Sequence, residues 1–336
     1  MPVVLITPEA MLHQKAPYVD HLLEAGFEIR YPEDPTFTRG LCGPETTVEV
    51  LSQCDAVIAG GEILTPDVLD ALPKLRVVAR SGVGYDRVDI PAATRLGIPV
   101  TITPTANHEA VAELTLSLIF AVAKEVLFND REARAGRWPM KPTRPIRGQT
   151  LGIVGLGRIG RSTAVRGQAL GMTVIAVESY PDQEFVQQHG IELVDLDTLL
   201  ARADFLSAHC PVTEETTGMF NAELFARMKP DSVFINTARG KLHVEADLIE
   251  ALQNGPLWAA GLDVFEQEPV SSEHPLHDVE NLLLCSPHVA GQSQESMVRM
   301  SLHAAENILR VFRGQPPSFT VNPEVLSDTS RVTWKR

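Results

Sequence analysis

The sequence has few aromatic residues and few cysteines, and its charge is strongly negative. Phe, Tyr and Trp make up 6% of the 336 residues, and the four cysteines form neither a CxxC pair nor a His/Cys cluster at zinc-binding spacing. We therefore expect no structural metal and no disulfide framework, and a reducing cytoplasmic setting. The net charge of −14 argues against a nucleic-acid or anionic-membrane partner. An anionic ligand would need locally placed cations.

Long apolar runs are also scarce. The most apolar segment, residues 110–128, contains Glu113, Lys124 and Glu125, which favours a buried helix over a membrane span. No basic stretch precedes the apolar run that starts at Val3, so this run predicts a first strand rather than a signal peptide. A composition of 44% hydrophobic and 21% charged residues is typical of a soluble globular enzyme, and 336 residues suffice for about two domains.

Short β-branched runs alternate with stretches of helical periodicity in two series, which predicts parallel sheets covered on both faces. A long helix over about 109–133 and a segment rich in Pro and Arg, 136–148, separate the series. The sequence leaves open on which side of that helix the domains divide. The predicted strands are Val3–Ile6, Phe27–Tyr31, Asp55–Ala59, Leu75–Ala79, Ile98–Thr101, Leu151–Val154, Thr173–Val177, Phe205–Ala208, Val233–Asn236 and Leu282–Cys285.

A GxGxxG pattern formed by Gly155, Gly157 and Gly160 lies between a predicted strand and a predicted helix, which is the context of a dinucleotide-binding turn. The alternative is a glycine turn that binds nothing. Glu178 ends the next strand, 178 − 155 = 23 positions on, near the ~20 expected for the acidic residue that binds the ribose hydroxyls. A carboxylate there would repel a 2′-phosphate, so the pattern favours NAD over NADP.

Three polar residues follow predicted strands and suit hydride transfer to a 2-oxo acid, which needs a cation for the carboxylate and a proton donor beside the carbonyl oxygen. Arg239 offers a planar fork for a carboxylate. His288 is placed to donate the proton, and Glu268 to pair with it. Taken singly, they also fit a surface arginine, a structural histidine and a solvated loop carboxylate.

Together these segments resemble the D-isomer-specific 2-hydroxyacid dehydrogenases, the family that includes phosphoglycerate dehydrogenase and glyoxylate or hydroxypyruvate reductases. The resemblance runs from about Val3 to Asn322, and its motifs are specific in combination. They are Arg80–Asp86, Asn107 with Val111–Glu113, Gly155–Gly160, His209–Pro211, Thr237–Gly240, Ala260–Phe265 and Pro287–His288.

The resemblance implies an α/β fold of two doubly wound parallel-sheet domains. Residues 1–101 and 292–336 would form a discontinuous, flavodoxin-like substrate domain, and 102–291 an inserted Rossmann NAD-binding domain. A helix over Gln294–Arg313 would return the chain to the substrate domain. The apolar helix that begins near Ala110 resembles the family's dimer contact, which implies a homodimer through the nucleotide-binding domain, although a plain core helix fits nearly as well.

The resemblance also implies the roles of the site residues. His288 would be the acid/base, Glu268 would favour its protonated form, and Arg239 would bind the carboxylate and polarise the carbonyl; Asp263 would hold the nicotinamide carboxamide. The implied NAD-binding residues are Gly155, Gly157, Arg158, Ile159, Gly160, Glu178, His209, Cys210, Pro211, Thr216, Thr237, Ala238, Arg239, Asp263, His288, Ala290 and Gly291. The implied substrate-binding residues are Arg80, Ser81, Gly82, Val83, Asn107, Arg239 and His288.

The sequence departs from the family's usual pattern at several positions. Glu178 replaces the commoner aspartate and keeps its charge. Lys241-Leu242-His243 stands where a small residue, an apolar residue and a valine usually follow Arg-Gly, which would bring a second basic group near the site. Glu62 lies in the stretch where phosphoglycerate dehydrogenases often carry an arginine. We therefore expect a small 2-oxo acid such as glyoxylate or hydroxypyruvate, with 3-phosphoglycerate as the alternative.

Two other activities occur on this fold. A formate dehydrogenase needs no proton donor and pairs its histidine with glutamine, so Glu268 argues against it. An NAD-sensing corepressor would keep the Arg/Glu/His set, and the motifs alone do not exclude it. A turnover assay with several 2-oxo acids and NADH separates an enzyme from such a binding protein.

Overall fold

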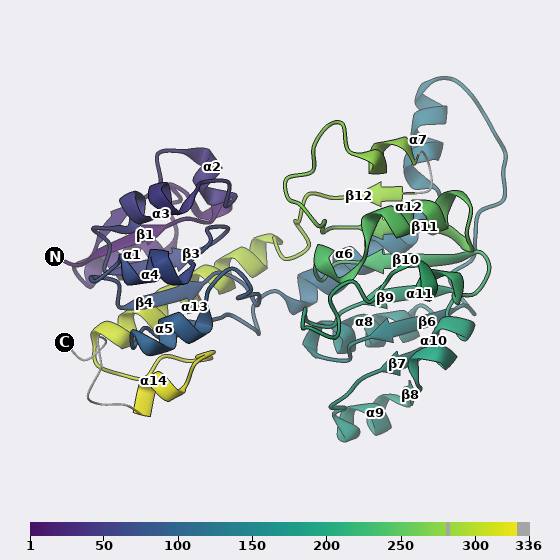
Figure 1. The fold of residues 1–336 in the computed structure, drawn as a ribbon. Helices are drawn as coiled ribbons and strands as arrows, with labels where there is room; N and C mark the ends of the chain where they lie inside the picture. The colour runs from purple at the N-terminus through teal and green to yellow at the C-terminus, as the bar shows by residue number, and fades with distance from the viewer. Residues whose placement is uncertain (280–282, 328–336) are drawn as a thin grey trace. The chain divides into compact units, whose positions relative to one another are not determined.

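The computed structural model describes residues 1–279 and 283–327, which form two compact units (Figure 1). The first unit comprises Met1–Asn107 and Gly291–Arg336, and the second comprises His108–Ala290. The first unit continues past residue 101, where the sequence predicts a break, because the chain beyond that point bonds to it. Ile102 N donates to Phe319 O over 3.2 Å, and Thr103 N donates to Gly82 O over 2.9 Å.

The first unit contains a parallel sheet of five strands in the order β2-β1-β3-β4-β5, the flavodoxin-like order. Its strands are β1 (Val3–Ile6), β2 (Glu28–Arg30), β3 (Ala56–Ala59), β4 (Val77–Arg80) and β5 (Val100–Thr101). Its helices are α1 (Pro17–Glu24), α2 (Pro35–Thr38), α3 (Pro44–Leu51), α4 (Pro66–Asp70), α5 (Ile90–Arg95), α13 (Gln294–Phe312) and α14 (Glu324–Ser327), with a 3₁₀ turn at Glu9–Met11.

Alternating side chains bury both faces of this sheet. On β1, Val3 and Leu5 pack in one core with α3, α4 and α5, whereas Val4 and Ile6 pack in the opposite core with α1 and α13. The helix α13 thus belongs to the first unit, as the resemblance implies, and its predicted last residue, Arg313, is its C-cap. Residues 328–336 of the predicted substrate domain lie outside the described residues.

The second unit contains a parallel sheet of seven strands in the order β12-β11-β10-β9-β6-β7-β8. Counted from β6, the first six follow the Rossmann order, with the topological switch point between β6 and β9. The strands are β6 (Thr150–Val154), β7 (Thr173–Val177), β8 (Glu192–Leu193), β9 (Phe205–Ala208), β10 (Ser232–Asn236), β11 (Leu257–Leu262) and β12 (Leu283–Cys285). The helices are α6 (His108–Ala123), α7 (Val126–Arg134), α8 (Arg158–Ala169), α9 (Gln183–His189), α10 (Leu196–Arg202), α11 (Ala222–Ala226) and α12 (Glu245–Gln253), with 3₁₀ turns at Gly240–Leu242 and Pro275–Asp278.

Helices cover both faces of the second sheet as well. On β10, Phe234 packs in the core that contains buried residues of α10, α11 and α12. Its neighbours Val233 and Ile235 pack in the opposite core, with residues of α6, α8 and α9. The predicted fold class, two doubly wound parallel α/β sheets, is confirmed.

The sequence predictions differ from the structure in three places. The expected helix over 109–133 is two helices, because Glu125 has a left-handed backbone (φ 48°) that ends α6 and starts α7. Lys124 Nζ bonds Arg144 O over 2.6 Å and Glu125 Oε2 pairs with Lys141 Nζ over 2.7 Å, which stabilises this break. The strands β8 and β11 were not predicted. Leu282, in the predicted last strand, lies outside the described residues.

Within residues 1–279 and 283–327, no helix is long and apolar enough to cross a membrane. The same part of the chain contains no group of three or more His, Cys, Asp or Glu side chains that could hold a metal ion.

Candidate active site

The glycine turn after β6 has the geometry of a dinucleotide cradle. Gly155 has φ 97°, and a Cβ there would come within 2.6 Å of Cys210 N. A Cβ at Gly160 would collide with the carbonyl oxygen of Gly155. By contrast, a Cβ at Gly157, the N-cap of α8, would meet no protein atom within 4 Å. The turn is therefore closed towards the protein and open at the helix N-terminus, where a pyrophosphate would bind.

The carboxylate of Glu178 lies beside this turn, directly after β7. Its Oε2 accepts Leu156 N over 2.6 Å, and its Oε1 accepts Tyr180 N over 2.9 Å. These bonds hold the carboxylate at the carboxyl end of β7, where an acidic residue of this fold bonds the ribose hydroxyls. Arg158 is exposed and Ile159 half-buried on the first turn of α8. The glycine turn and Glu178 thus fit an adenine dinucleotide.

His209, Cys210 and Pro211 follow β9, the strand next to β6. His209 N donates to Val154 O over 2.7 Å, and its ring Nε2 lies 2.9 Å from Ser207 Oγ. Burial lowers the pKa of His209 to about 4 and raises that of the Cys210 thiol to about 11, so both are neutral at pH 7. Thr216 Oγ1 donates to Pro211 O over 2.7 Å and so closes this loop on itself.

Arg239 sits in a tight turn after β10. The amide of Asn236, the last residue of that strand, braces the turn: its Oδ1 accepts Ala238 N over 2.9 Å and its Nδ2 donates to Arg239 O over 2.8 Å. Thr237 Oγ1 lies 2.8 Å from Thr115 Oγ1 of α6. A Cβ on Gly240 would overlap the backbone of Phe265, so the turn packs directly against the segment that leads to Glu268.

Glu268 and His288 form a contact in the second unit. Glu268 Oε2 lies 2.8 Å from His288 Nδ1, and its other oxygen, Oε1, accepts Phe265 N over 3.1 Å. The His288 side chain is 48% exposed and that of Glu268 22%. The carboxylate thus orients one ring nitrogen of an imidazole that stays accessible.

Asp263 shapes the loop that carries His288. It is fully buried and accepts three hydrogen bonds, from Ser286 Oγ (2.7 Å), Val289 N (2.9 Å) and Ala290 N (2.8 Å). Burial raises the pKa of this carboxyl, and the three donors oppose that rise. His288 has φ 53°, a strained value for a residue with a side chain. Asp263 therefore holds this strained loop, in addition to the carboxamide contact predicted for it.

Apart from Arg239 and His288, the residues predicted to bind the acid belong to the first unit. Arg80, at the end of β4, donates to Gly84 O over 3.0 Å and to Gly60 O. Gly82 has φ 144°, and its N donates to Thr103 Oγ1 over 3.0 Å.

Ser81 Oγ lies 3.5 Å from Met11 Sδ, and Val83 is half-buried. A Cβ on Gly291 would come within 2.9 Å of Asn107 Nδ2, so Gly291, predicted to bind NAD, packs against a residue predicted to bind substrate. The binding roles of these residues stay predictions.

Two of the departures from the family pattern have a structural role. The Glu62 side chain is buried, and its Oε2 accepts Thr7 Oγ1 over 2.7 Å and Gly60 N over 3.0 Å. It is therefore not presented to a ligand. His243 is also buried, and burial lowers its pKa to about 4, so it adds no positive charge. Lys241 is exposed. The second basic group expected near the site is thus Lys241, not His243.

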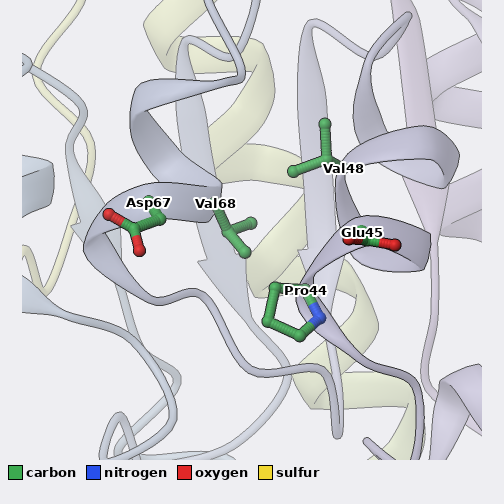
Figure 2. A pocket seen from close by; sticks show the side chains of 5 residues that line it. All are labelled: Pro44, Glu45, Val48, Asp67 and Val68. Atoms are coloured by element: carbon green, nitrogen blue, oxygen red, sulfur yellow. The ribbon is translucent and has the colours of Figure 1, made fainter.

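A pocket of about 390 Å³ lies on the first unit between α3 and α4 (Figure 2). Its lining residues are Pro44, Glu45, Val48, Asp67 and Val68. No predicted site residue is among them, and we assign it no part in the chemistry.

Two polar residues of this site were not predicted from the sequence. Asn236 was included only as the end of a predicted strand, and Ser286 was not singled out. An asparagine just before a Thr-Ala-Arg-Gly turn is a recognisable signal, because asparagine side chains commonly bond the backbone two residues on. Nothing in the sequence marks Ser286.

Comparison with known proteins supports the family resemblance found in the sequence. The profile described as the D-isomer specific 2-hydroxyacid dehydrogenase, NAD binding domain, matches residues 116–290. A protein named glyoxylate reductase from Korarchaeum cryptofilum is 40% identical over 289 residues, which are 83% of this chain and 86% of that protein. A protein named D-3-phosphoglycerate dehydrogenase from Archaeoglobus fulgidus is 35% identical over 90% of this chain, which spans only 57% of that protein's length.

Among solved structures, the TT0316 protein from Thermus thermophilus superposes with a TM-score of 0.84 at 35% identity, over 95% of this chain and 99% of that one. The match to the NAD binding domain covers the glycine turn, Glu178, Arg239 and the Glu268–His288 contact. The chain therefore belongs to the D-isomer specific 2-hydroxyacid dehydrogenase family and is an NAD-dependent oxidoreductase.

Proposed function

We propose that this enzyme reduces a small 2-oxo acid, such as glyoxylate or hydroxypyruvate, to the corresponding 2-hydroxy acid. The observation that carries the proposal is the contact between Glu268 Oε2 and His288 Nδ1 over 2.8 Å, with the imidazole half exposed. An accessible imidazole with a carboxylate partner is a proton donor for a carbonyl oxygen that gains negative charge.

His288 and Arg239 divide the work on the substrate. Bound NADH supplies a hydride to the carbonyl carbon. As that carbon accepts the electron pair, charge develops on the oxygen, and His288 Nε2 donates the proton that makes the hydroxyl group. Glu268 holds Nδ1 and so orients the ring with Nε2 free to face the substrate. Arg239 binds the substrate carboxylate through two parallel N–H···O bonds, which orients the carbonyl.

NAD binding falls to the second unit. The glycine turn of Gly155, Gly157 and Gly160 accommodates the pyrophosphate at the N-terminus of α8, and Glu178 accepts the ribose hydroxyls. Because Glu178 is an anion, it disfavours the 2′-phosphate of NADP. The contacts assigned to the loops after β9, β10 and β12 follow from the family resemblance and are part of the proposal.

The substrate class rests on two observations. The relatives named glyoxylate reductase are 40–42% identical, and this chain spans 78–86% of their length. Relatives named D-3-phosphoglycerate dehydrogenase are 35–38% identical, and the chain spans 53–60% of theirs. Two arginines that could otherwise bind a substrate phosphate are also engaged: Arg80 with Gly84 O and Gly60 O, and Arg134 with Asp130 over 2.8 Å. These contacts support a substrate without a phosphate.

A substrate panel tests the proposal. NADH oxidation is followed with glyoxylate, hydroxypyruvate and phosphohydroxypyruvate at matched concentrations. We expect the highest kcat/KM with one of the unphosphorylated acids. A higher kcat/KM with phosphohydroxypyruvate would identify a phosphoglycerate dehydrogenase instead. Tight NADH binding without turnover of any acid would favour a nucleotide sensor.

A homodimer through the second unit is part of the proposal. Five large apolar side chains are exposed on α6, α7 and the loop after them: Phe120 (37%), Val126 (48%), Leu127 (61%), Trp138 (79%) and Met140 (90%). Large apolar side chains that are exposed close together in the sequence are a common mark of a protein interface. Light scattering of the wild type and of Leu127→Asp tests it: a dimer that becomes a monomer supports the interface, and a monomeric wild type contradicts it.

A cytoplasmic location is also proposed, on the strength of the four free thiols. The localisation of a tagged chain in its own cell tests this location.

A further inference from the structure

Behind the turn that carries Arg239 lies a short chain of buried hydrogen bonds. Asn236, which is fully buried at the end of β10, accepts Ala238 N with its Oδ1 and donates to Arg239 O with its Nδ2. One amide side chain thus fixes two peptide groups of the turn. The direction in which the Arg239 side chain leaves the backbone depends on how firmly that amide is held.

His243 supplies the remaining contact of this amide. Its Nδ1 lies 3.0 Å from Asn236 Nδ2. An amide nitrogen donates two hydrogen bonds and accepts none, so His243 Nδ1 must be the acceptor and the ring proton must be on Nε2. The two N–H groups of Asn236 then have one acceptor each, Arg239 O and His243 Nδ1. The reversed amide would place its oxygen against Arg239 O and lose both bonds, so the network fixes its orientation.

The environment keeps His243 in the form this network needs. The residue is 1% exposed and its ring lies 5.9 Å from that of Phe234. Burial lowers its pKa to about 4, so the ring is a neutral acceptor throughout the physiological range. Its Nε2 has no hydrogen-bond partner among residues 1–279 and 283–327. Burial of Nε2 without a hydrogen-bond partner lowers the stability of the fold. The hydrogen bond accepted by Nδ1 is what this histidine provides and an apolar residue would not.

This histidine also stands at a position where the family pattern usually has valine. A valine has no acceptor, and it would leave one N–H of Asn236 buried and unsatisfied. The amide could then rotate to seek another partner and release Ala238 N or Arg239 O. The sequence difference therefore acts on the turn of Arg239 and on no part of the glycine turn that binds the dinucleotide.

We propose that His243 is a positioning residue for capture of the acid: through Asn236, it holds the turn that aims the Arg239 guanidinium at the substrate carboxylate. This inference rests on the proposed role of Arg239. It assigns to this chain a brace that the usual valine lacks, and it predicts an effect on substrate binding that is separate from an effect on NADH.

Two substitutions at this position separate the hydrogen bond from the packing. His243→Val removes the acceptor. His243→Asn restores one, because its Oδ1 is two bonds beyond Cβ, as Nδ1 is in histidine. Leu248→Val is the matched control, since Leu248 is fully buried in the same core and makes no contact in the hydrogen-bonded chain. For each variant, the KM for glyoxylate, kcat, the Kd for NADH and the melting temperature are measured.

We expect KM for glyoxylate to rise about tenfold in His243→Val, as for loss of one buried hydrogen bond, with the Kd for NADH within about twofold of wild type. His243→Asn should recover most of this loss. Leu248→Val should lower the melting temperature and leave KM unchanged. An unchanged KM in His243→Val overturns the proposal, as do equal effects on KM and on the Kd for NADH or a failure of His243→Asn to rescue.

Hydrogen exchange gives a readout that does not depend on activity. The Ala238 N–H is bonded to Asn236 Oδ1, and we expect its protection to fall in His243→Val and to recover in His243→Asn. If the wild-type enzyme reduces no 2-oxo acid, the proposed function fails while this measurement still decides the brace. Unchanged protection of Ala238 in His243→Val rules out the brace whatever the substrate.

Discussion

The two units each place an arginine near the carboxyl end of a strand, and they use it differently. Arg80, in the first unit, donates to the carbonyls of Gly60 and Gly84, which belong to two separate loops. Arg239, in the second, donates to the carbonyl of its own neighbour, Ala238, and a different side chain, Asn236, braces its turn. The shape of the Arg239 turn therefore depends on Asn236 and not on the arginine itself, whereas Arg80 connects the loops around it.

The largest expected effect concerns the second unit's acid/base. His288→Ala removes the group that donates the proton, and general acid/base catalysis typically contributes about 10²- to 10⁴-fold in rate. We expect a loss of that order in kcat with little change in the Kd for NADH, measured by single-turnover kinetics and fluorescence titration. A loss of less than about tenfold would assign the proton to another group.

The comparison of the two arginines is tested by the same change in both units. Arg239→Lys replaces a planar fork by a point charge, and we expect kcat/KM for glyoxylate to fall about 10- to 100-fold with the melting temperature unchanged. Arg80→Lys should instead lower the melting temperature, because two loops lose a shared donor. A stable Arg80→Lys with a greatly raised KM would show that Arg80 acts mainly in substrate binding and would contradict the contrast.

Cofactor choice should change by a smaller factor. Glu178→Ala removes the anion that disfavours a 2′-phosphate, and it also removes the acceptor of Leu156 N and Tyr180 N. We expect the preference for NADH over NADPH to narrow about tenfold, through weaker NADH binding and better NADPH binding. A wild-type enzyme that binds NADPH more tightly than NADH would contradict the assignment of Glu178.

Acid should destabilise the second unit before the first, and the loss of stability should be smallest at neutral pH. His209 and His243 both lie there, and burial lowers both pKa values from 6.5 to about 4. The unfolded chain therefore binds more protons than the folded one between these values, so stability is lost as the pH falls from about 6.5 to about 4. Hydrogen exchange at pH 7, 5.5 and 4.5 checks this expectation. Earlier opening of the first unit would contradict it.

Much of the fold was predictable, because buried parallel strands leave short β-branched runs between turn residues. The strands β1, β7 and β9 have the predicted bounds. The strand β11 was missed because Leu257–Leu262 contains Trp258 and Gly261 and no β-branched residue. The break between α6 and α7 was missed because a left-handed glutamate leaves no sequence signal.

The candidate site was predictable where a motif fixes the chemistry, as at Gly155, Glu178 and Arg239. The site was less predictable at residues whose role depends on whether the side chain is buried. Glu62 and His243 are polar residues in loop-like sequence, and a charged or exposed role was the natural expectation. The structure buries both side chains, and Glu62 bonds Thr7 while His243 bonds Asn236. Thr7 is 55 residues from Glu62 in the sequence, so no local pattern indicates that contact.

The central claim is that Glu268 supports His288 as the proton donor of a 2-oxo acid reductase. The most direct test is kcat for the reduction of glyoxylate by the wild type, Glu268→Gln and the control Glu273→Gln, which changes an exposed carboxylate of the same loop. Glu268→Gln replaces the carboxylate that holds His288 Nδ1, so we expect kcat to fall by about tenfold or more while the Kd for NADH stays within about twofold of wild type. Glu273→Gln should leave both values in place. An unchanged kcat in Glu268→Gln would contradict the account.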